Sequence, residues 1–427
     1  MKANFRRERA LSIFAVVILL SCGPASAVET RYQLGYLLNY QSNIRRTVTD
    51  PKSEWVNTLT ASMQATEDTT NLNMTLDASL QRLFYKNKSF ADRTVANATG
   101  NVLWTIIPER FTWTVNDYLR ETVIDPRNAN IQTNRQRTNT FTTGPDLIFK
   151  AGRRDTFILG HRFIDTYQEV TNLDSQQNVS NLTWQHQLSP ISILSIIGAY
   201  QDIDYDAGTL PDRVITDTYL RYDMARAVTT FLVELGSTEV RTVGRSPIEG
   251  SRRVFSVDYQ ITGNETLNLR ISDQILEAGN IIDAALTPGD ALADGRFLTA
   301  NVFREKRTTL SYAHGGPFVT LNLSIYATTR NYMQDATLDN QLNGGTVAIA
   351  YTVSPTLDMT FNADFSRRFY PTDGRQLDYA SYVLGATYII NPQLTLTGSA
   401  GVITRRSSVP GQDYDNFTAS IGITYDI

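Results

Sequence analysis

Three histidines are the residues whose types could carry out acid–base chemistry in this sequence. His186 and His314 lie beside predicted tight turns, so we expect both on one rim of the fold. His161 lies inside a predicted strand near Asp165, but nothing nearby in the sequence supplies a nucleophile paired with a base, as covalent catalysis requires. The sequence therefore predicts no catalytic residue, and we expect that the protein is not an enzyme.

An acidic stretch resembles a calcium-binding loop at first sight. Asp202, Asp204 and Asp206 alternate along the chain, and a loop of the EF-hand type would next need glycine at its sixth place and glutamate at its twelfth. Ala207 and Arg213 occupy those places. We therefore expect no dedicated metal site and no cofactor, with loose divalent binding to this acidic loop left open.

Paired arginines lie at the loop-side ends of predicted strands: Arg45-Arg46, Arg252-Arg253, Arg367-Arg368 and Arg405-Arg406. Guanidinium groups bind phosphates and carboxylates in a bidentate manner. We expect the pairs to hold lipopolysaccharide phosphates or loop carboxylates, with contact to an acidic polymer as the alternative. The formal net charge of −4 gives no indication of a nucleic-acid partner.

Alternation of apolar and polar residues is the main structural signal of the chain. Along 319–330, Leu321, Leu323 and Ile325 alternate with polar neighbours, and the pattern returns at 72–81, 267–274, 347–353, 357–366 and 394–405. This period of two is that of a β-strand, whose successive side chains point to opposite faces. The chain is therefore predicted to be all-β.

The length of the alternating runs indicates which kind of sheet forms. Runs of ten to thirteen residues match the ~9–11 residues that a tilted strand needs to cross a bilayer, whereas sandwich strands usually have ~5–6. Only a closed barrel leaves no unpaired strand edge in lipid. We predict a closed antiparallel transmembrane β-barrel, with a soluble β-solenoid as the competing interpretation.

Tight turns alternate with longer polar connections. The tight turns are predicted near Asp68, Pro108, Gly152, Ser189, Ala225, Gly263, Gly315, Ser354 and Asn391. The longer connections are 42–54, 125–137, 202–213, 242–252, 276–296, 331–345, 369–378 and 406–415. Short periplasmic turns opposite longer external loops are typical of outer-membrane barrels. With both termini on the periplasmic side, the nine tight turns predict about 20 strands, with 18 as the next count.

A barrel of this size encloses a lumen that its own side chains cannot fill. If the apolar face contacts lipid, polar and charged residues line the lumen. The candidates are Asp77, Asn116, Glu234, Asp258, Arg270, Asn322, Arg330, Asp358, Asn362, Asp364 and Arg368. The simplest interpretation is that they hydrate the lumen and pair with one another. Because alternation begins at Tyr32, we expect no N-terminal plug domain and a constriction built from inward-folded loops.

The lipid-facing residues and the last strand give further membrane signals. Leu321, Leu323, Met359, Phe361, Ile421 and Ile423 are expected to contact lipid. Phe417 and Tyr425 continue the apolar face of the last strand, and an aromatic residue third from the end resembles the signature that the barrel assembly machinery recognises. Ile427 replaces the usual terminal Phe or Trp.

Residues 1–27 have the organisation of a secretory signal peptide. A basic segment precedes the apolar run 10–20, and Ala25-Ser26-Ala27 forms an A-x-A cleavage site. The run is too short for a membrane-spanning helix, which needs ~20 residues. Cleavage after Ala27 would leave the barrel as residues 28–427; the alternative is a lipoprotein lipidated at Cys22, the only cysteine. Either signal predicts the cell outer membrane of a Gram-negative bacterium.

The motif Tyr40-Gln41-Ser42-Asn43-Ile44-Arg45-Arg46, followed by Ser-Pro or Asn-Pro hairpins at 189–190, 354–355 and 391–392, resembles a known family. It is similar to the β-barrel porins of exopolysaccharide loci, some of which accompany the PEP-CTERM/exosortase sorting system. The resemblance extends over nearly the whole mature chain. It implies passive passage of a polysaccharide across the outer membrane, driven by synthesis or by a periplasmic or inner-membrane export partner. No catalytic residue is carried over.

Three functional hypotheses follow from these observations. The first is an export channel for an exopolysaccharide, the second a general diffusion porin for small solutes, and the third a structural or binding barrel with a blocked lumen. The expected partners are outer-membrane lipid, lipopolysaccharide and the barrel assembly machinery, joined in the first hypothesis by the polysaccharide and its export partner. Steady conductance in a planar bilayer would favour the porin.

Overall fold

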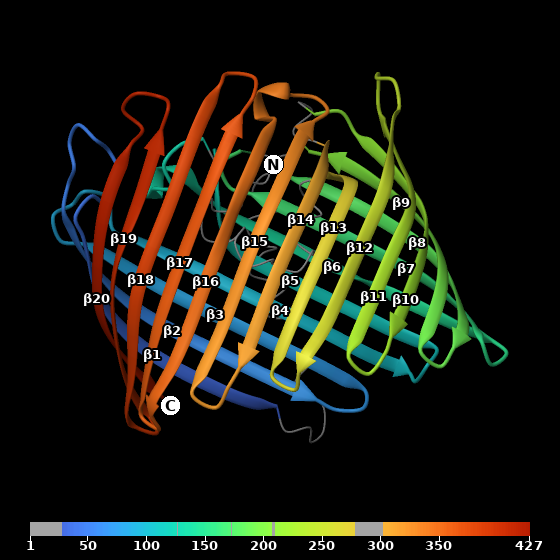
Figure 1. Ribbon diagram of the computed structural model, residues 1–427, viewed down its shortest axis with the longest axis horizontal. Helices are drawn as coiled ribbons and strands as arrows, with labels where there is room; N and C mark the ends of the chain where they lie inside the picture. Colours follow the sequence, from blue (N-terminus) through green and yellow to red (C-terminus); the bar gives the residue numbers. More distant parts are fainter. Residues whose placement is uncertain (1–27, 126, 172, 207–209, 278–301) are drawn as a thin grey trace, which may run out of the picture.

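The described residues form a single sheet of twenty antiparallel strands that closes into a barrel (Figure 1). The structure is a computed structural model that describes residues 28–125, 127–171, 173–206, 210–277 and 302–427. Strand β1 (Glu29–Gln41) pairs with β2 (Glu54–Asp68) on one side and with β20 (Tyr414–Asp426) on the other, which closes the sheet. The predicted all-β transmembrane barrel of about 20 strands is confirmed, and the solenoid is wrong.

The other strands follow one another around the barrel in chain order. They are β3 (Leu72–Tyr85), β4 (Arg93–Ile107), β5 (Phe111–Val123), β6 (Arg135–Ala151), β7 (Asp155–Gln168), β8 (Ser175–Ser189), β9 (Ser192–Tyr205), β10 (Arg213–Ala225), β11 (Thr229–Thr242), β12 (Ile248–Thr262), β13 (Glu265–Glu277), β14 (Val302–Gly315), β15 (Val319–Tyr332), β16 (Asn340–Ser354), β17 (Leu357–Tyr370), β18 (Arg375–Asn391) and β19 (Leu394–Ser407). Two short 3-10 helices, η1 (Gln132–Asn134) and η3 (Ala336–Leu338), lie in connections. In the described ranges no helix is long and apolar enough to cross a membrane.

The two ends of the barrel differ in the length of their connections. At the end that holds the C-terminus, here the turn end, two or three residues join neighbouring strands, and all nine predicted tight turns lie there (Figure 1). Gly152 takes a φ of 83° in one of them, a left-handed conformation that glycine adopts without strain. At the opposite end, here the loop end, the structure has two further connections, 86–92 and 169–174, that were not among those predicted from the sequence. The predicted long loop at 276–296 lies almost entirely outside the described residues.

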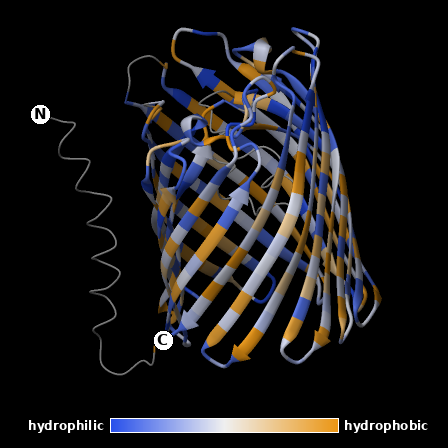
Figure 2. Cartoon of the chain, turned by 90° about the vertical axis from the view of Figure 1, so that its left-hand side faces the viewer, coloured by the Kyte–Doolittle hydropathy of each residue, from blue (hydrophilic) through white to orange (hydrophobic). Residues whose placement is uncertain are grey.

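Hydrophobic and hydrophilic residues alternate along the strands (Figure 2). Since successive side chains of a strand point to opposite faces, this alternation separates an outer from an inner face. On β15, Leu323 and Ile325 are 37% and 56% exposed on the outside, while their neighbours Ser324 and Tyr326 are buried on the inside. The residues expected to face lipid all occupy outer positions: Leu321, Leu323, Met359, Phe361, Ile421 and Ile423.

Exposed aromatic residues form two belts on the outer face. Near the turn end, Tyr351, Tyr388 and Tyr425 are each more than two-fifths exposed. Nearer the loop end, Phe365 and Tyr382 are about half exposed. Aromatic girdles at the two membrane interfaces are a general feature of transmembrane barrels. The apolar band between these belts is therefore the lipid-facing part of the sheet.

The polarity of the two faces inverts near the loop end. On β9 and β11 the inner residues Ile203 and Val240 are completely buried, in an apolar cluster that includes Ile215 of β10. The outer neighbours Asp204 and Arg241 are exposed. Beyond the lipid, the outer face of the sheet is in contact with water, and the inner face packs against other side chains. Apolar residues therefore occupy inner positions here and polar residues occupy outer ones. The expectation that polar and charged residues line the inner face therefore does not hold for this apolar cluster.

Candidate functional site

Cross-strand register assembles the polar lining of the lumen. Residues paired in register project from the same face of a sheet, so one inward residue fixes the orientation of its partners on both sides. Asp77, for example, pairs with Gln64 of β2 and Thr99 of β4, and Thr99 pairs with Tyr118 of β5. Strand pairing thus turns residues far apart in sequence into continuous polar rows.

The sequence-based lumen candidates all occupy inner positions in this register. They are Asp77 (β3), Asn116 (β5), Glu234 (β11), Asp258 (β12), Arg270 (β13), Asn322 and Arg330 (β15), and Asp358, Asn362, Asp364 and Arg368 (β17). They do not converge on one centre. Arg330 and Arg368 lie near the loop end, whereas Asp77, Glu234 and Asp358 lie nearer the turn end.

Opposite charges on the inner face are paired across neighbouring strands. An Arg252 nitrogen lies 2.8 Å from the Glu234 carboxylate, and the Arg252 guanidinium lies 4.3 Å from the centroid of the Tyr219 ring. Arg330 lies 2.8 Å from Glu305. Since the partners neutralise each other, these parts of the wall present little net charge to the lumen.

Sequence reasoning missed a similar inner pair, Arg162 of β7 and Asp146 of β6, whose nitrogen and oxygen are 2.6 Å apart. The Arg162 guanidinium also donates to the Pro145 carbonyl at 2.9 Å and to the Thr114 hydroxyl at 3.4 Å. Asp146 follows Pro145 and pairs in register with Gly160, and neither proline nor glycine is typical of a strand interior. Only the register between β6 and β7 reveals that the two charges face each other.

Three of the four arginine pairs do not act as pairs. Consecutive residues of a strand point to opposite faces, so each pair is divided between the lumen and the outside. Arg252 binds Glu234 inside, whereas Arg253 is exposed outside. Likewise, Arg405 is buried inside, while Arg406 binds Asp415 on the outer face. The two members of each pair within a strand therefore cannot bind one ligand together.

Loops at the loop end reach the inner wall. The Arg405 side chain of β19 donates to the main-chain carbonyl of Arg127, in the connection between β5 and β6, at 2.6 Å. Arg213 of β10 donates to Gln334, in the connection between β15 and β16, at 2.6 Å. Each contact joins a strand to a connection between two strands elsewhere in the barrel. Such contacts agree with the expectation that loops fold inward.

Glu54 anchors another connection at the loop end. Its carboxylate has no exposed surface, and it accepts hydrogen bonds from the main-chain nitrogens of Asn87 at 2.7 Å and Ser89 at 2.9 Å. Burial raises the pKa of this carboxyl, but the main-chain donors outweigh it and bring the pKa below its ordinary value. The charged carboxylate therefore fixes the connection between β3 and β4.

The histidines build no catalytic centre within the described residues. His161 Nδ1 lies 3.0 Å from the Ser180 hydroxyl on the outer face, a partner that the sequence does not reveal. No carboxylate or amide among the described side chains orients the other imidazole nitrogen, as a Ser–His nucleophile needs. His186 lies 2.8 Å from Asp155 and His314 lies 3.5 Å from Glu265, both at the turn end as expected.

The acidic stretch at 202–206 has a structural explanation. Asp202 and Asp204 occupy outer positions of β9, whose inner positions hold the buried Ile203 and Tyr205. No group of three His, Cys, Asp or Glu side chains in the described part of the chain is arranged to hold a metal ion.

Comparisons with known proteins extend the fold assignment. No protein-family model and no curated protein matches the sequence. The FrpB iron transporter from Neisseria meningitidis (F3-3 variant) matches in structure with a TM-score of 0.52 and 9% identity, covering 93% of this chain and 81% of that chain. The ferric enterobactin receptor from Pseudomonas aeruginosa in complex with enterobactin matches with a TM-score of 0.51 and 10% identity, covering 94% and 82%.

These structural matches establish a common architecture. Because the sequence identities are so low, the substrates of those proteins are not transferred to this chain. The fold and its interior define the class of the protein as an outer-membrane type of β-barrel. Its particular features are a polar inner wall with paired charges and loops that reach into the mouth.

Proposed function

We propose that the protein is an outer-membrane channel that exports an exopolysaccharide. The observation that carries the proposal is the chemistry of the inner wall, where several charges are paired across strands and neutral polar groups occupy the rows between them. On β6, for instance, Gln136, Thr138, Thr140 and Thr142 face inward in succession. Pores that select ions carry rings of a single charge sign, which paired charges do not provide. Hydroxyl and amide groups instead match the donors and acceptors of sugar hydroxyls.

The resemblance of the first-strand motif at Tyr40–Arg46 to porins of exopolysaccharide loci supports the same function. Transport would be passive, driven by polymer synthesis or by a periplasmic or inner-membrane partner. Exposed basic residues on the outer face at the loop end, such as Arg253 and Arg367, suit lipopolysaccharide phosphates.

Deletion of the gene tests the proposal directly. The deletion strain should accumulate polysaccharide in the periplasm and release little into the medium, and expression of the wild-type protein should restore release. Normal release from a deletion strain that has no paralogue would contradict the export function.

A barrel with a closed lumen, serving a structural or binding role, is the second candidate. The loop contacts of Arg405 and Arg213 with Arg127 and Gln334 favour it, because they narrow the mouth. The protein reconstituted in planar bilayers separates the possibilities: a general diffusion porin conducts steadily, a closed barrel never conducts, and an exporter conducts when its polymer or partner engages it.

A further inference from the structure

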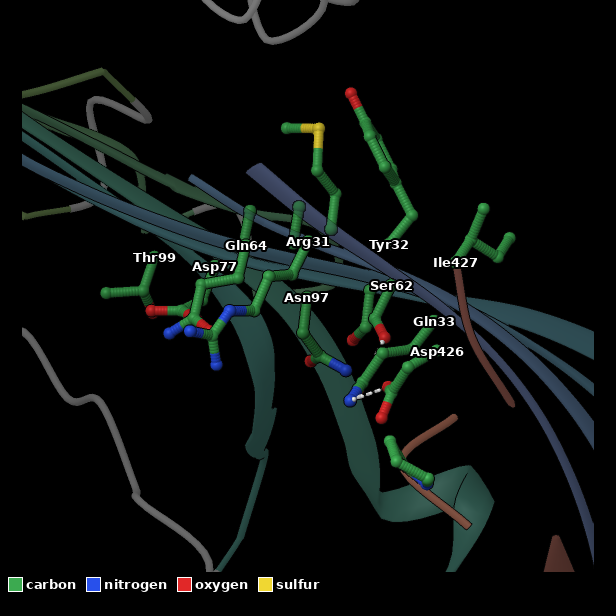
Figure 3. Close-up of a pocket in the computed structure, with 15 residues that line it drawn as sticks. Arg31, Tyr32, Gln33, Ser62, Gln64, Asp77, Asn97, Thr99, Asp426 and Ile427 are labelled. Atoms are coloured by element: carbon green, nitrogen blue, oxygen red, sulfur yellow. Dashed lines mark hydrogen bonds between the residues drawn. The ribbon is translucent and has the colours of Figure 1, made fainter. Parts of the chain in front are cut away.

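A pocket of polar side chains lies at the turn end of the barrel wall, outside the paired charges described above. It has a volume of about 560 Å³ and is formed by β1 to β4 together with the end of β20. Arg31, Gln64, Asp77, Asn97 and Thr99 point to the same side of the sheet, toward the lumen (Figure 3). Tyr32 points to the opposite side, where the outer face lies (Figure 3).

The register arranges these side chains as a grid of two parallel rows. Arg31, Gln64, Asp77 and Thr99 form one row across four strands, and Gln33, Ser62, Ser79 and Asn97 form the other. Strands in a sheet are ~4.8 Å apart, so each row extends over about 14 Å. The rows are two residues apart along each strand, or about 7 Å. A grid of this size accommodates several linked sugar rings lying flat on the wall.

Four members of the grid have no partners among the described residues. The side chains of Gln64, Asp77, Asn97 and Thr99 make neither a hydrogen bond nor an ion pair within that part of the chain. Gln33, by contrast, donates to Asp426 at 2.6 Å. Elsewhere on the inner wall the carboxylates Asp146, Glu234 and Glu305 are each paired with an arginine. Asp77 is therefore a lumen carboxylate that remains available to a solute.

We propose that this pocket is a weak binding site for a short stretch of polyhydroxylated, uncharged sugar at the periplasmic entrance of the lumen. The proposal rests on the export function and names the part of the wall that first receives the polymer. The Asp77 carboxylate accepts hydrogen bonds from two neighbouring sugar hydroxyls, while the Asn97 and Gln64 amides both donate and accept. Tyr32 faces outward, so it provides no ring for stacking on this side. Binding by polar groups alone is weak, and a transported molecule must be able to leave.

Equilibrium binding of a neutral glucose hexamer to the purified full-length barrel in detergent tests the site. Saturation-transfer NMR reports binding whether or not the mouth is closed. Asp77→Ala should raise the dissociation constant by about tenfold or more, the effect of removing a charged hydrogen-bond partner, and Asn97→Ala by about three- to tenfold. Asp358→Ala, which removes another inner carboxylate outside the pocket, should leave it unchanged. Heat-modifiable gel migration verifies that each variant is folded.

The outcomes distinguish this site from the export function. If the wild-type barrel does not bind the hexamer, or if Asp77→Ala and Asp358→Ala bind it equally, the pocket is not a sugar site, and the deletion experiment still decides on export. If Asp77→Ala and Asn97→Ala weaken binding while Asp358→Ala does not, the pocket stands. Normal polysaccharide release from the deletion strain would then refute export and leave a sugar site in a barrel of another function.

Discussion

Arg252 on β12 donates two hydrogen bonds to one carboxylate oxygen of Glu234 on β11, from Nε at 3.0 Å and from Nη2 at 2.8 Å. The two side chains are only 20% and 7% exposed, and Arg221 of β10 approaches the same carboxylate at 3.8 Å. Three consecutive strands are thus joined inside the barrel by side chains as well as by their ladders. The outer face of the wall is stabilised by contact with lipid. The inner face has no such contact, and ion pairs between neighbouring strands stabilise it instead.

Glu234→Ala should therefore destabilise the barrel by about 1.5–3 kcal/mol, because it removes a charged hydrogen-bond partner and leaves Arg252 without it. Unfolding by urea in lipid vesicles, followed by tryptophan fluorescence, measures the change. The matched control is Glu239→Ala on the outer face of the same strand, whose partner Arg241 is 67% exposed. An exposed pair contributes below about 1 kcal/mol, so equal losses in the two variants would contradict the internal role.

The lipid face makes a second prediction. Leu323→Arg places a charge on the outer face of β15 and should cost about 2–4 kcal/mol near the bilayer midplane. Asn322→Arg places the same charge in the lumen and should cost much less, since water or neighbouring polar groups solvate it. The free energy of unfolding in vesicles measures both variants. Similar losses would mean that the two faces are not separated as the structure has them.

The sequence predicts the barrel well because the relevant signal is local. Period-two alternation, run length and turn residues such as Gly152 and Ser189 are each readable within one hairpin, and together they determine strand number and facing. The pairing of Arg162 with Asp146, or of His161 with Ser180, depends on register between strands, which alternation alone does not specify. The inversion at Ile203 and Asp204 has another cause. Alternation of apolar and polar residues looks the same in the sequence whether the apolar face contacts lipid outside the barrel or packed loops inside it, so it does not reveal where the faces exchange.

Glu54 makes the stability of the loop end dependent on pH. Its pKa in the folded protein lies below the ordinary value of 4.5, so its stabilising effect is fully present above about pH 4.5 and is lost as the pH falls through the lower folded value. Glu54→Gln should destabilise the barrel by about 1.5–3 kcal/mol at pH 7 and have little effect once the wild-type carboxyl is protonated. Urea unfolding of both proteins between pH 3 and pH 7 provides the comparison. The exposed Glu249→Gln should show no such convergence, and a constant difference for Glu54→Gln would contradict the mechanism.

Arg405 tests whether the loops restrict the mouth of the barrel. Its guanidinium holds the carbonyl of Arg127 at 2.6 Å and the Gln412 side chain at 3.2 Å, so Arg405→Ala should release the connection between β5 and β6 from the opposite wall. The released loop should leave a wider and more variable opening, and single-channel recordings should show higher conductance with more current noise. Arg406→Ala is the matched control, because it removes the same charge from the next residue, which binds Asp415 on the outer face. Arg405→Ala and Arg406→Ala channels with the same conductance as the wild type would show that this loop does not form the constriction. An increase confined to Arg405→Ala would place the constriction at the contact between β19 and the 124–134 connection.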